Sequence, residues 1–195
     1  MNHRRAWMSD SPQSLQEIDI SVAEQYRQEL SDDWLRMVME AALVEALPQS
    51  EPTQVGLMIA DDETVQGLNR QFRGLDEVTD VLSFSASHSG HWEGEPQESE
   101  QSDETLVESE EPEELAFVLP PGEPSPLGEV IISFPQTIRQ AQERNGPVEQ
   151  ELALLIVHGV LHLVGYDHME PEDEAQMQAK ERSALAAVSQ LEAGI

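Results

Sequence analysis

The clearest pattern of the sequence lies in residues 147–168, which read PVEQELALLIVHGVLHLVGYDH. Pro147 suits the first position of a helix, because its φ is already helical and its missing N–H is not needed there. From Pro147 to about Val164 the sequence is apolar on nearly every side, which predicts a central buried helix. Gly165 can then end the helix by adopting a positive φ.

Three histidines occupy the second half of this stretch. His158 and His162 are four residues apart on the predicted helix, so their rings share one face and can reach one ion. A turn at Gly165 can bring His168 to the same ion. Three imidazoles with an open fourth position are typical of catalytic zinc sites. We therefore predict one divalent metal ion, zinc, bound by these three histidines.

Two alternatives concern individual residues of this motif. The histidines could be unrelated core residues, but three of the chain's six histidines fall within eleven residues at ligand spacing. Asp167 could orient a ligand imidazole, or it could be a turn residue or helix cap, and both roles stay open. The donor set also accepts nickel and other divalent ions.

The same spacing occurs in the metzincin pattern H-E-x-x-H-x-x-G-x-x-H. In this chain Gly159 takes the place of the glutamate, which is the general base of the metalloproteases. A metzincin-like metallopeptidase is therefore an alternative, and the missing proton acceptor weighs against it.

Hydrophobic periodicity and turn residues divide the rest of the chain into further elements. The expected strands span 14–22, 54–60, 80–84 and 127–134, and the other expected helices span 31–47, 61–74, 135–144 and 171 onward. Residues 1–14 are expected to be a disordered leader, and 15–195 a single metallo-hydrolase domain. Within that domain, residues 85–126 contain no Lys or Arg, and twelve acidic residues lie between Glu93 and Glu123. This composition predicts a disordered acidic insertion.

The overall charge restricts the partners. Ten Lys and Arg residues against 39 Asp and Glu residues give a formal net charge of −29, which repels polyanions and anionic membranes. Binding of nucleic acid would therefore require a local basic site. The longest apolar run, 152–157, is too short to cross a bilayer, and the N-terminus has no signal-peptide pattern. We expect a soluble, cytoplasmic protein without a membrane partner.

Three motifs, in the same order and spacing, resemble the YbeY family of bacterial endoribonucleases. Residues 158–168 read HGVLHLVGYDH, residues 68–84 read LNRQFRGLDEVTDVLSF, and residues 127–129 read LGE. The resemblance covers about residues 15–190, and the insertion before Leu127 is longer than expected for compact members.

The resemblance implies an α+β fold, in which a small mixed β-sheet packs with helices and the central buried helix carries the histidines. It also implies a single-strand-specific, metal-dependent endoribonuclease of rRNA maturation, acting at the 3′ end of small-subunit rRNA and in ribosome quality control. Its partners would be ribosomal RNA and ribosomal proteins or the small subunit, with no DNA expected. Arg73 and His158 would be the catalytic residues.

The chemistry of Arg73 agrees with this role, because a guanidinium carries permanent charge and binds phosphate with two hydrogen bonds. A surface ion pair is the alternative. Arg70 could add positive charge nearby, and Asp80 could activate water, although a structural role is favoured. A non-catalytic ribosome-assembly factor with a structural metal is the remaining functional alternative, since an acidic surface suits basic ribosomal proteins.

Overall fold

The computed structural model describes residues 16–47, 52–86, 123–166 and 170–194. In chain order the elements are β1 (Gln16–Val22), η1 (Glu24–Tyr26), α1 (Asp32–Ala46), β2 (Thr53–Ala60), α2 (Asp62–Arg73), β3 (Val81–Ser85), β4 (Ser125–Ser133), α3 (Phe134–Glu143), α4 (Val148–Leu163) and α5 (Pro171–Glu192). These strands and helices confirm the predicted α+β class and every predicted element. The short 3-10 helix η1 was not predicted.

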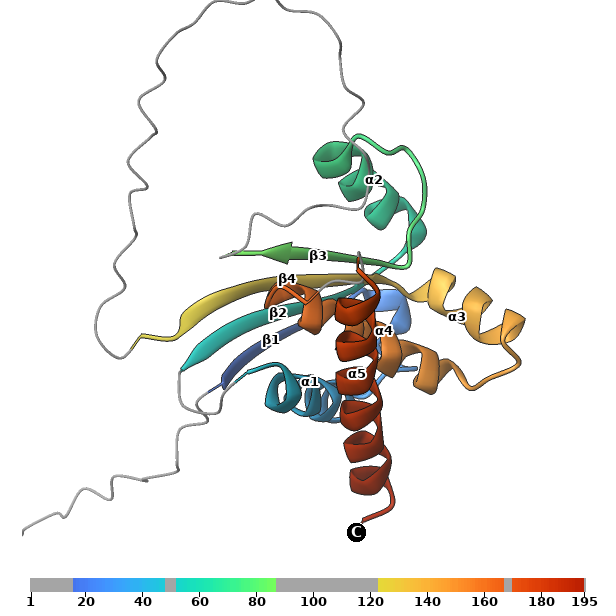
Figure 1. Cartoon of the computed structure of the whole chain (residues 1–195). Coiled ribbons are helices and arrows are strands. Elements are labelled where there is room, and N and C mark those ends of the chain that lie inside the picture. The colour runs from blue at the N-terminus through green and yellow to red at the C-terminus, as the bar shows by residue number, and fades with distance from the viewer. Residues whose placement is uncertain (1–15, 48–51, 87–122, 167–169, 195) are drawn as a thin grey trace, which may run out of the picture.

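The strands form one mixed sheet in the order β1-β2-β4-β3 (Figure 1). β1, β2 and β4 run parallel, with Ile18 opposite Val55 and Leu57 opposite Val130. β3 pairs antiparallel with β4 and places Phe84 opposite Glu129. Parallel neighbours need a crossover connection, and α1 provides it between β1 and β2.

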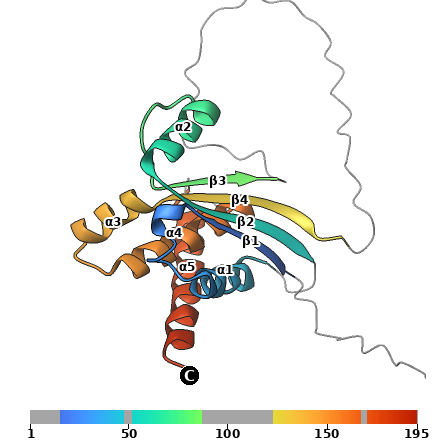
Figure 2. The ribbon, with the colours of Figure 1, turned by 180° about the vertical axis from the view of Figure 1, so that it is seen from behind.

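Helices cover the two faces of the sheet unequally (Figures 1 and 2). α1, α4 and α5 lie on one side, whereas α2 lies on the other side over β3 and β4. α4 contacts β3, β4, α1, α3 and α5. Ten of its sixteen residues are buried, so α4 is the central buried helix that the sequence predicts. Among the described helices, none is long and apolar enough to cross a membrane.

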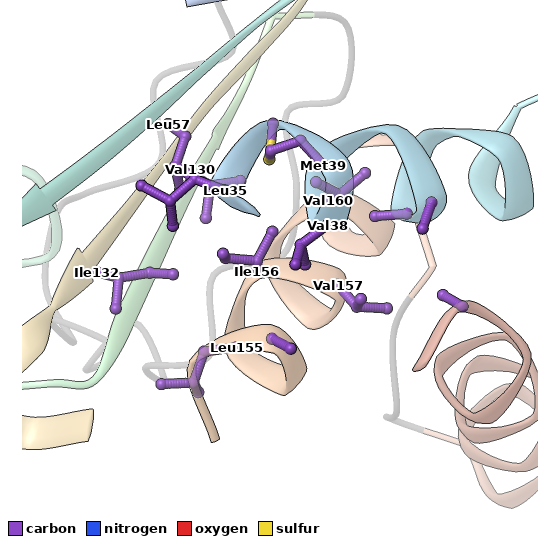
Figure 3. Close-up of a cluster of buried hydrophobic side chains, with 14 of the residues drawn as sticks. Leu35, Val38, Met39, Leu57, Val130, Ile132, Leu155, Ile156, Val157 and Val160 are labelled. Carbon is purple, nitrogen blue, oxygen red and sulfur yellow. The ribbon is translucent and has the colours of Figure 1, made fainter. Parts of the chain in front are cut away.

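The main core fills the space between the sheet, α1 and α4 (Figure 3). Aliphatic side chains from these elements meet there, including Leu35, Val38, Met39, Leu57, Val130, Ile132, Leu155, Ile156, Val157 and Val160. Because α4 packs against the sheet and α1 in this core and also contacts α5, its position and orientation relative to the sheet are fixed.

A polar cluster ties the start of α2 to α3 at the carboxyl ends of β2 and β4. Asp61 caps α2 by accepting the Thr64 N–H at 2.9 Å, and its hydrogen bonds with Thr64 lower the pKa of Asp61. Arg139 donates to both oxygens of Asp62 at 2.9 Å, and Ser133 Oγ donates at 2.6 Å. These bonds, chiefly those from Arg139, lower the pKa of Asp62 below its usual 3.8.

Some element boundaries differ from the prediction. Pro147 is the N-cap residue of α4 rather than its first helical residue, because its ψ of 143° is extended. Ser85 closes β3 and Ser125 opens β4, so both strands reach into the predicted insertion. The predicted leader (1–14) and residues 87–122 lie outside the described residues and stay predictions.

Candidate active site

The last two turns of α4 direct two imidazoles toward each other. The Nε2 atoms of His158 and His162 are 3.0 Å apart. The ring centroids are 4.5 Å apart and the ring planes cross at 84°. The side chain of His158 is 27% exposed, so the pair lies at a solvent-accessible point of a buried helix. The predicted pairing of these two histidines on one helix face is therefore present.

This geometry fits a single metal ion. Two imidazoles bound to one tetrahedral ion at about 2.0–2.1 Å place their nitrogens about 3.3 Å apart. The observed separation of 3.0 Å is close to that value. His168, the third predicted ligand, and Asp167 lie outside the described residues, so their roles stay predictions.

A carboxylate that the sequence analysis did not identify contacts the pair. Glu181 Oε1 lies 2.8 Å from Nδ1 of His158, and the Glu181 side chain is 15% exposed. Glu181 comes from α5, 23 residues along the chain. Helical spacing is the signal that could have found it, because residue 181 lies on the same face of α5 as the apolar Met177, Ala184 and Val188.

Two serines of β3 hold the backbone of α4. Ser83 Oγ donates to the carbonyl of Gly159 at 3.1 Å, and Ser85 Oγ donates to the carbonyl of Leu163 at 2.8 Å. The last carbonyls of a helix lack intrahelical donors, so Ser85 satisfies one of them beside His162. The strand thus fixes the end of the helix that carries the histidines.

Gly159, between the histidines, faces the sheet at very short range. A β-carbon at this position would lie 2.5 Å from Cγ1 of Val130 and 3.2 Å from Oγ of Ser83. The position that holds the general base in a metzincin is therefore filled by β3 and β4, and a glutamate side chain has no room there. The packing of the helix, and not only the identity of one residue, disfavours the metallopeptidase alternative.

Arg73 is the last residue of α2. Gly74 ends the helix with a φ of 73°, and its N–H donates to the carbonyl of Arg70 at 3.2 Å. The Arg73 side chain is half-buried, whereas Arg70 is exposed and pairs with Asp76 at 3.3 Å. An exposed pair contributes little to stability. Of the two arginine side chains, that of Arg73 has less conformational freedom because it is half-buried.

The residue before Arg73 and the helix that carries the histidines both contact the last residues of β3. Phe72 packs edge-on against Phe84 with ring centroids 5.1 Å apart, and the next residue, Ser85, bonds to α4 beside His162. α2 and α4 approach β3 from opposite faces (Figure 1). In the described part of the chain, β3 has β4 on one side and no strand on the other. Side chains from the two faces can therefore meet around this edge.

Asp80 has a structural position. Its Oδ1 accepts the Val81 N–H at 2.8 Å and the Thr79 hydroxyl at 3.2 Å, and its Oδ2 accepts the amide of Gln140 at 2.9 Å. Oδ1 thus holds the start of β3, and Oδ2 joins it to α3. These contacts agree with the structural role that the sequence analysis favours.

The fold and the site define an α+β protein in which a buried helix presents paired imidazoles beside the edge of a mixed sheet. The sequence matches the family described as Endoribonuclease YbeY over residues 17–189. The chain belongs to this YbeY family. The resemblance inferred from the three motifs is therefore confirmed.

Individual relatives cover nearly the whole chain. The endoribonuclease YbeY of Roseiflexus sp. (strain RS-1) is 36% identical over 182 residues, covering 93% of this chain and 96% of the relative. That of Symbiobacterium thermophilum is 39% identical over 156 residues, covering 80% and 85%. The solution structure of TM1509 from Thermotoga maritima has the same fold, with a TM-score of 0.52, 24% identity and 88% coverage of both chains. The peptidase and assembly-factor alternatives are not favoured, because these sequence relatives have a nuclease name.

Proposed function

We propose that this chain is a metal-dependent endoribonuclease that cleaves single-stranded RNA during ribosomal RNA maturation. The nuclease name of its relatives supports the activity. The observation that carries the proposal is the approach of two Nε2 atoms to 3.0 Å on α4. The last residues of β3 contact both α4 and Phe72, the neighbour of Arg73, which supports a role for Arg73 at the same site. The 3′ end of small-subunit rRNA and ribosome quality control are the roles that the family resemblance adds.

His158 and His162 would hold one divalent ion through Nε2, and the motif assigns the third ligand to His168. We propose zinc, because three neutral imidazoles with an open position suit a catalytic zinc site. When bound, such an ion polarises a phosphoryl oxygen and makes water a stronger acid.

The chain's own residues would bind and orient the phosphodiester. Arg73 carries permanent charge and can donate two parallel hydrogen bonds to phosphate oxygens. The same guanidinium would stabilise the negative charge that accumulates as phosphorus becomes pentacoordinate. Because β3 holds α4 through Ser83 and Ser85, the histidines keep their place while the substrate is turned over.

The charge of the chain determines how RNA would be recruited. A net charge of −29 repels a polyanion at long range, so the affinity for free RNA should be low and should fall steeply with salt. Basic ribosomal proteins or the small subunit itself would supply complementary charge to the acidic surface. These partners imply a cytoplasmic location and no role on DNA or membranes.

The test compares cleavage of a labelled single strand and of the matching duplex, with added zinc or with a chelator. We expect zinc-dependent cleavage of the single strand alone. His158→Ala and Arg73→Ala should each lower the rate by about 100-fold or more, the usual cost of removing a group that stabilises transition-state charge. Arg70→Ala, which removes an exposed arginine one turn away, is the matched control and should leave the rate close to wild type.

The same variants should be expressed in cells that lack the wild-type chain, and the 3′ end of the small-subunit rRNA mapped. Unprocessed ends are expected with His158→Ala and Arg73→Ala. Full cleavage by both variants in vitro, together with normal rRNA ends in cells, would refute the proposed activity.

A further inference from the structure

Glu181 is a shielded acid that faces an imidazole. Its side chain is 15% exposed, and its Oε1 lies 2.8 Å from Nδ1 of His158. Glu151 provides a comparison within the same fold: its side chain is 7% exposed, and Arg144 pairs with it at 2.7 Å. Burying a carboxylate costs free energy unless it is paired or hydrogen-bonded. The neighbour of Glu181 is a predicted metal ligand rather than an arginine.

The position of Glu181 is set independently of the histidine. On its own helix, Met177, Ala184 and Val188 are buried in the core. Immediately before it, Lys180 donates to the carbonyl of Glu45 on α1 at 2.6 Å. α5 therefore brings the carboxylate to α4 as part of a rigid unit.

Lys180 also links α5 to the segment that follows α4. Its Nζ lies 5.1 Å from the centroid of the Tyr166 ring, a distance typical of a cation–π contact. Tyr166 precedes the last histidine of the motif by two residues. Two successive residues of α5, 180 and 181, thus contact the motif on both sides of Gly165.

We propose that Glu181 is a positioning residue of the metal centre and that α5 is thereby part of that centre. A neutral imidazole has one N–H and one lone pair. An ionised carboxylate accepts only, so the contact at 2.8 Å places the proton on Nδ1 and leaves the lone pair on Nε2, directed at His162. The hydrogen bond also fixes the ring and makes it a stronger ligand. This inference rests on the metal site of the proposed function.

A linkage between metal binding and the docking of α5 follows from this arrangement. The ion would bind Nε2 of His158 while Glu181 holds Nδ1 of the same ring. Binding the ion would therefore favour the state in which α5 is docked, and detaching α5 would weaken the site. The protons of α5 backbone amides should exchange more slowly in the zinc-loaded chain than in the metal-free chain.

The experiment measures zinc affinity of the full-length chain by competition with a chromophoric chelator at fixed pH. Glu181→Ala should weaken zinc binding by about 10–100-fold, the usual effect of removing such a partner. Glu181→Gln keeps an oxygen that can accept the Nδ1 proton but loses the charge, so its affinity should fall between those of wild type and Glu181→Ala. Glu172→Ala, an exposed glutamate of the same helix, is the matched control and should bind as wild type does.

Two further measurements keep the outcomes distinct. The visible spectrum of the cobalt-substituted chain should change in Glu181→Gln, because the charge on the partner alters the ligand strength of His158. Unfolding of the metal-free variants shows whether Glu181→Ala is folded. If Glu181→Ala is unfolded, the zinc affinity and cobalt spectrum of Glu181→Gln test the role of Glu181. Unaltered zinc affinity and cobalt spectrum in Glu181→Gln would overturn the inference. A wild-type chain that binds no metal would instead overturn the proposed function.

Discussion

Replacing Gly159 with alanine should lower the free energy of unfolding, although alanine is the better helix former. The new β-carbon would lie 2.5 Å from Cγ1 and 3.1 Å from Cγ2 of Val130. Val130 is 0% exposed and β-branched, so a change of its χ1 rotamer is costly. α4 must therefore move away from the sheet, which stretches the Ser83 hydrogen bond to residue 159.

The magnitude follows from three contributions. Overpacking a core costs about 1–3 kcal/mol, and the weakened hydrogen bond costs about 1 kcal/mol. The higher helix propensity of alanine offsets about 1 kcal/mol of this. The expected net loss of stability is about 1–3 kcal/mol.

Gly67, inside α2, is the matched control for this prediction. A β-carbon there meets no atom within 4 Å, so Gly67→Ala should raise the free energy of unfolding by about 0.5–1 kcal/mol. Urea unfolding followed by far-UV circular dichroism measures both variants. Val130→Ala should destabilise the Gly159→Ala background less than it destabilises wild type. If Gly159→Ala proved as stabilising as Gly67→Ala, the close approach of α4 to the sheet would be refuted.

Three other perturbations test contacts outside the His158–His162 pair. The folded-state pKa of Asp62 lies below its unfolded value of 3.8, so its pair with Arg139 stabilises the fold above pH 3.8, and this stability is lost as the pH falls through the folded pKa. The difference in free energy of unfolding between wild type and Asp62→Asn should therefore shrink from about pH 5 to about pH 2. Urea titrations measure this difference, and a constant value would contradict the prediction. Arg144→Ala leaves Glu151 shielded without this pair and should cost about 1–3 kcal/mol in thermal unfolding at neutral pH, whereas no change would show that solvent replaces the arginine. Ser85→Ala removes a donor to the end of α4 and should cost about 1 kcal/mol, with faster amide exchange confined to that end; uniform exchange would count against a local role.

Local sequence signals predicted most of the fold. The expected helices 31–47 and 61–74 begin at Ser31 and Asp61, and each of these side chains accepts the backbone N–H three residues later. The second of these ranges closes at Gly74, which ends α2 in the left-handed conformation. Each signal acts within one turn of chain, which is why it can be read without tertiary contacts.

The parts of the site that depend on packing could not be predicted in this way. The spacing of His158 and His162 is a property of one helix, so their meeting was predictable. Glu181 reaches His158 only because α5 docks on α1 and α4. Its spacing from Met177 and Ala184 places it on the buried face of α5, but no pattern within α5 indicates that it will meet a histidine. The sequence indicated that Gly159 lacks a carboxylate, but only the sheet behind the helix explains why a glycine is needed there.

The pairing of β3 with β4 has a consequence for the connection between them. Ala86 donates its N–H to the carbonyl of Leu127 at 2.9 Å, so the chain leaves one strand and enters the next from adjacent positions. The entropy cost of closing a loop grows by only about 0.6 kcal/mol for each doubling of its length. Lengthening a turn of about four residues to span 87–122 takes about three doublings, or about 2 kcal/mol. Residues added or removed between these strands should therefore change the stability only slightly and leave the histidines on α4 in place.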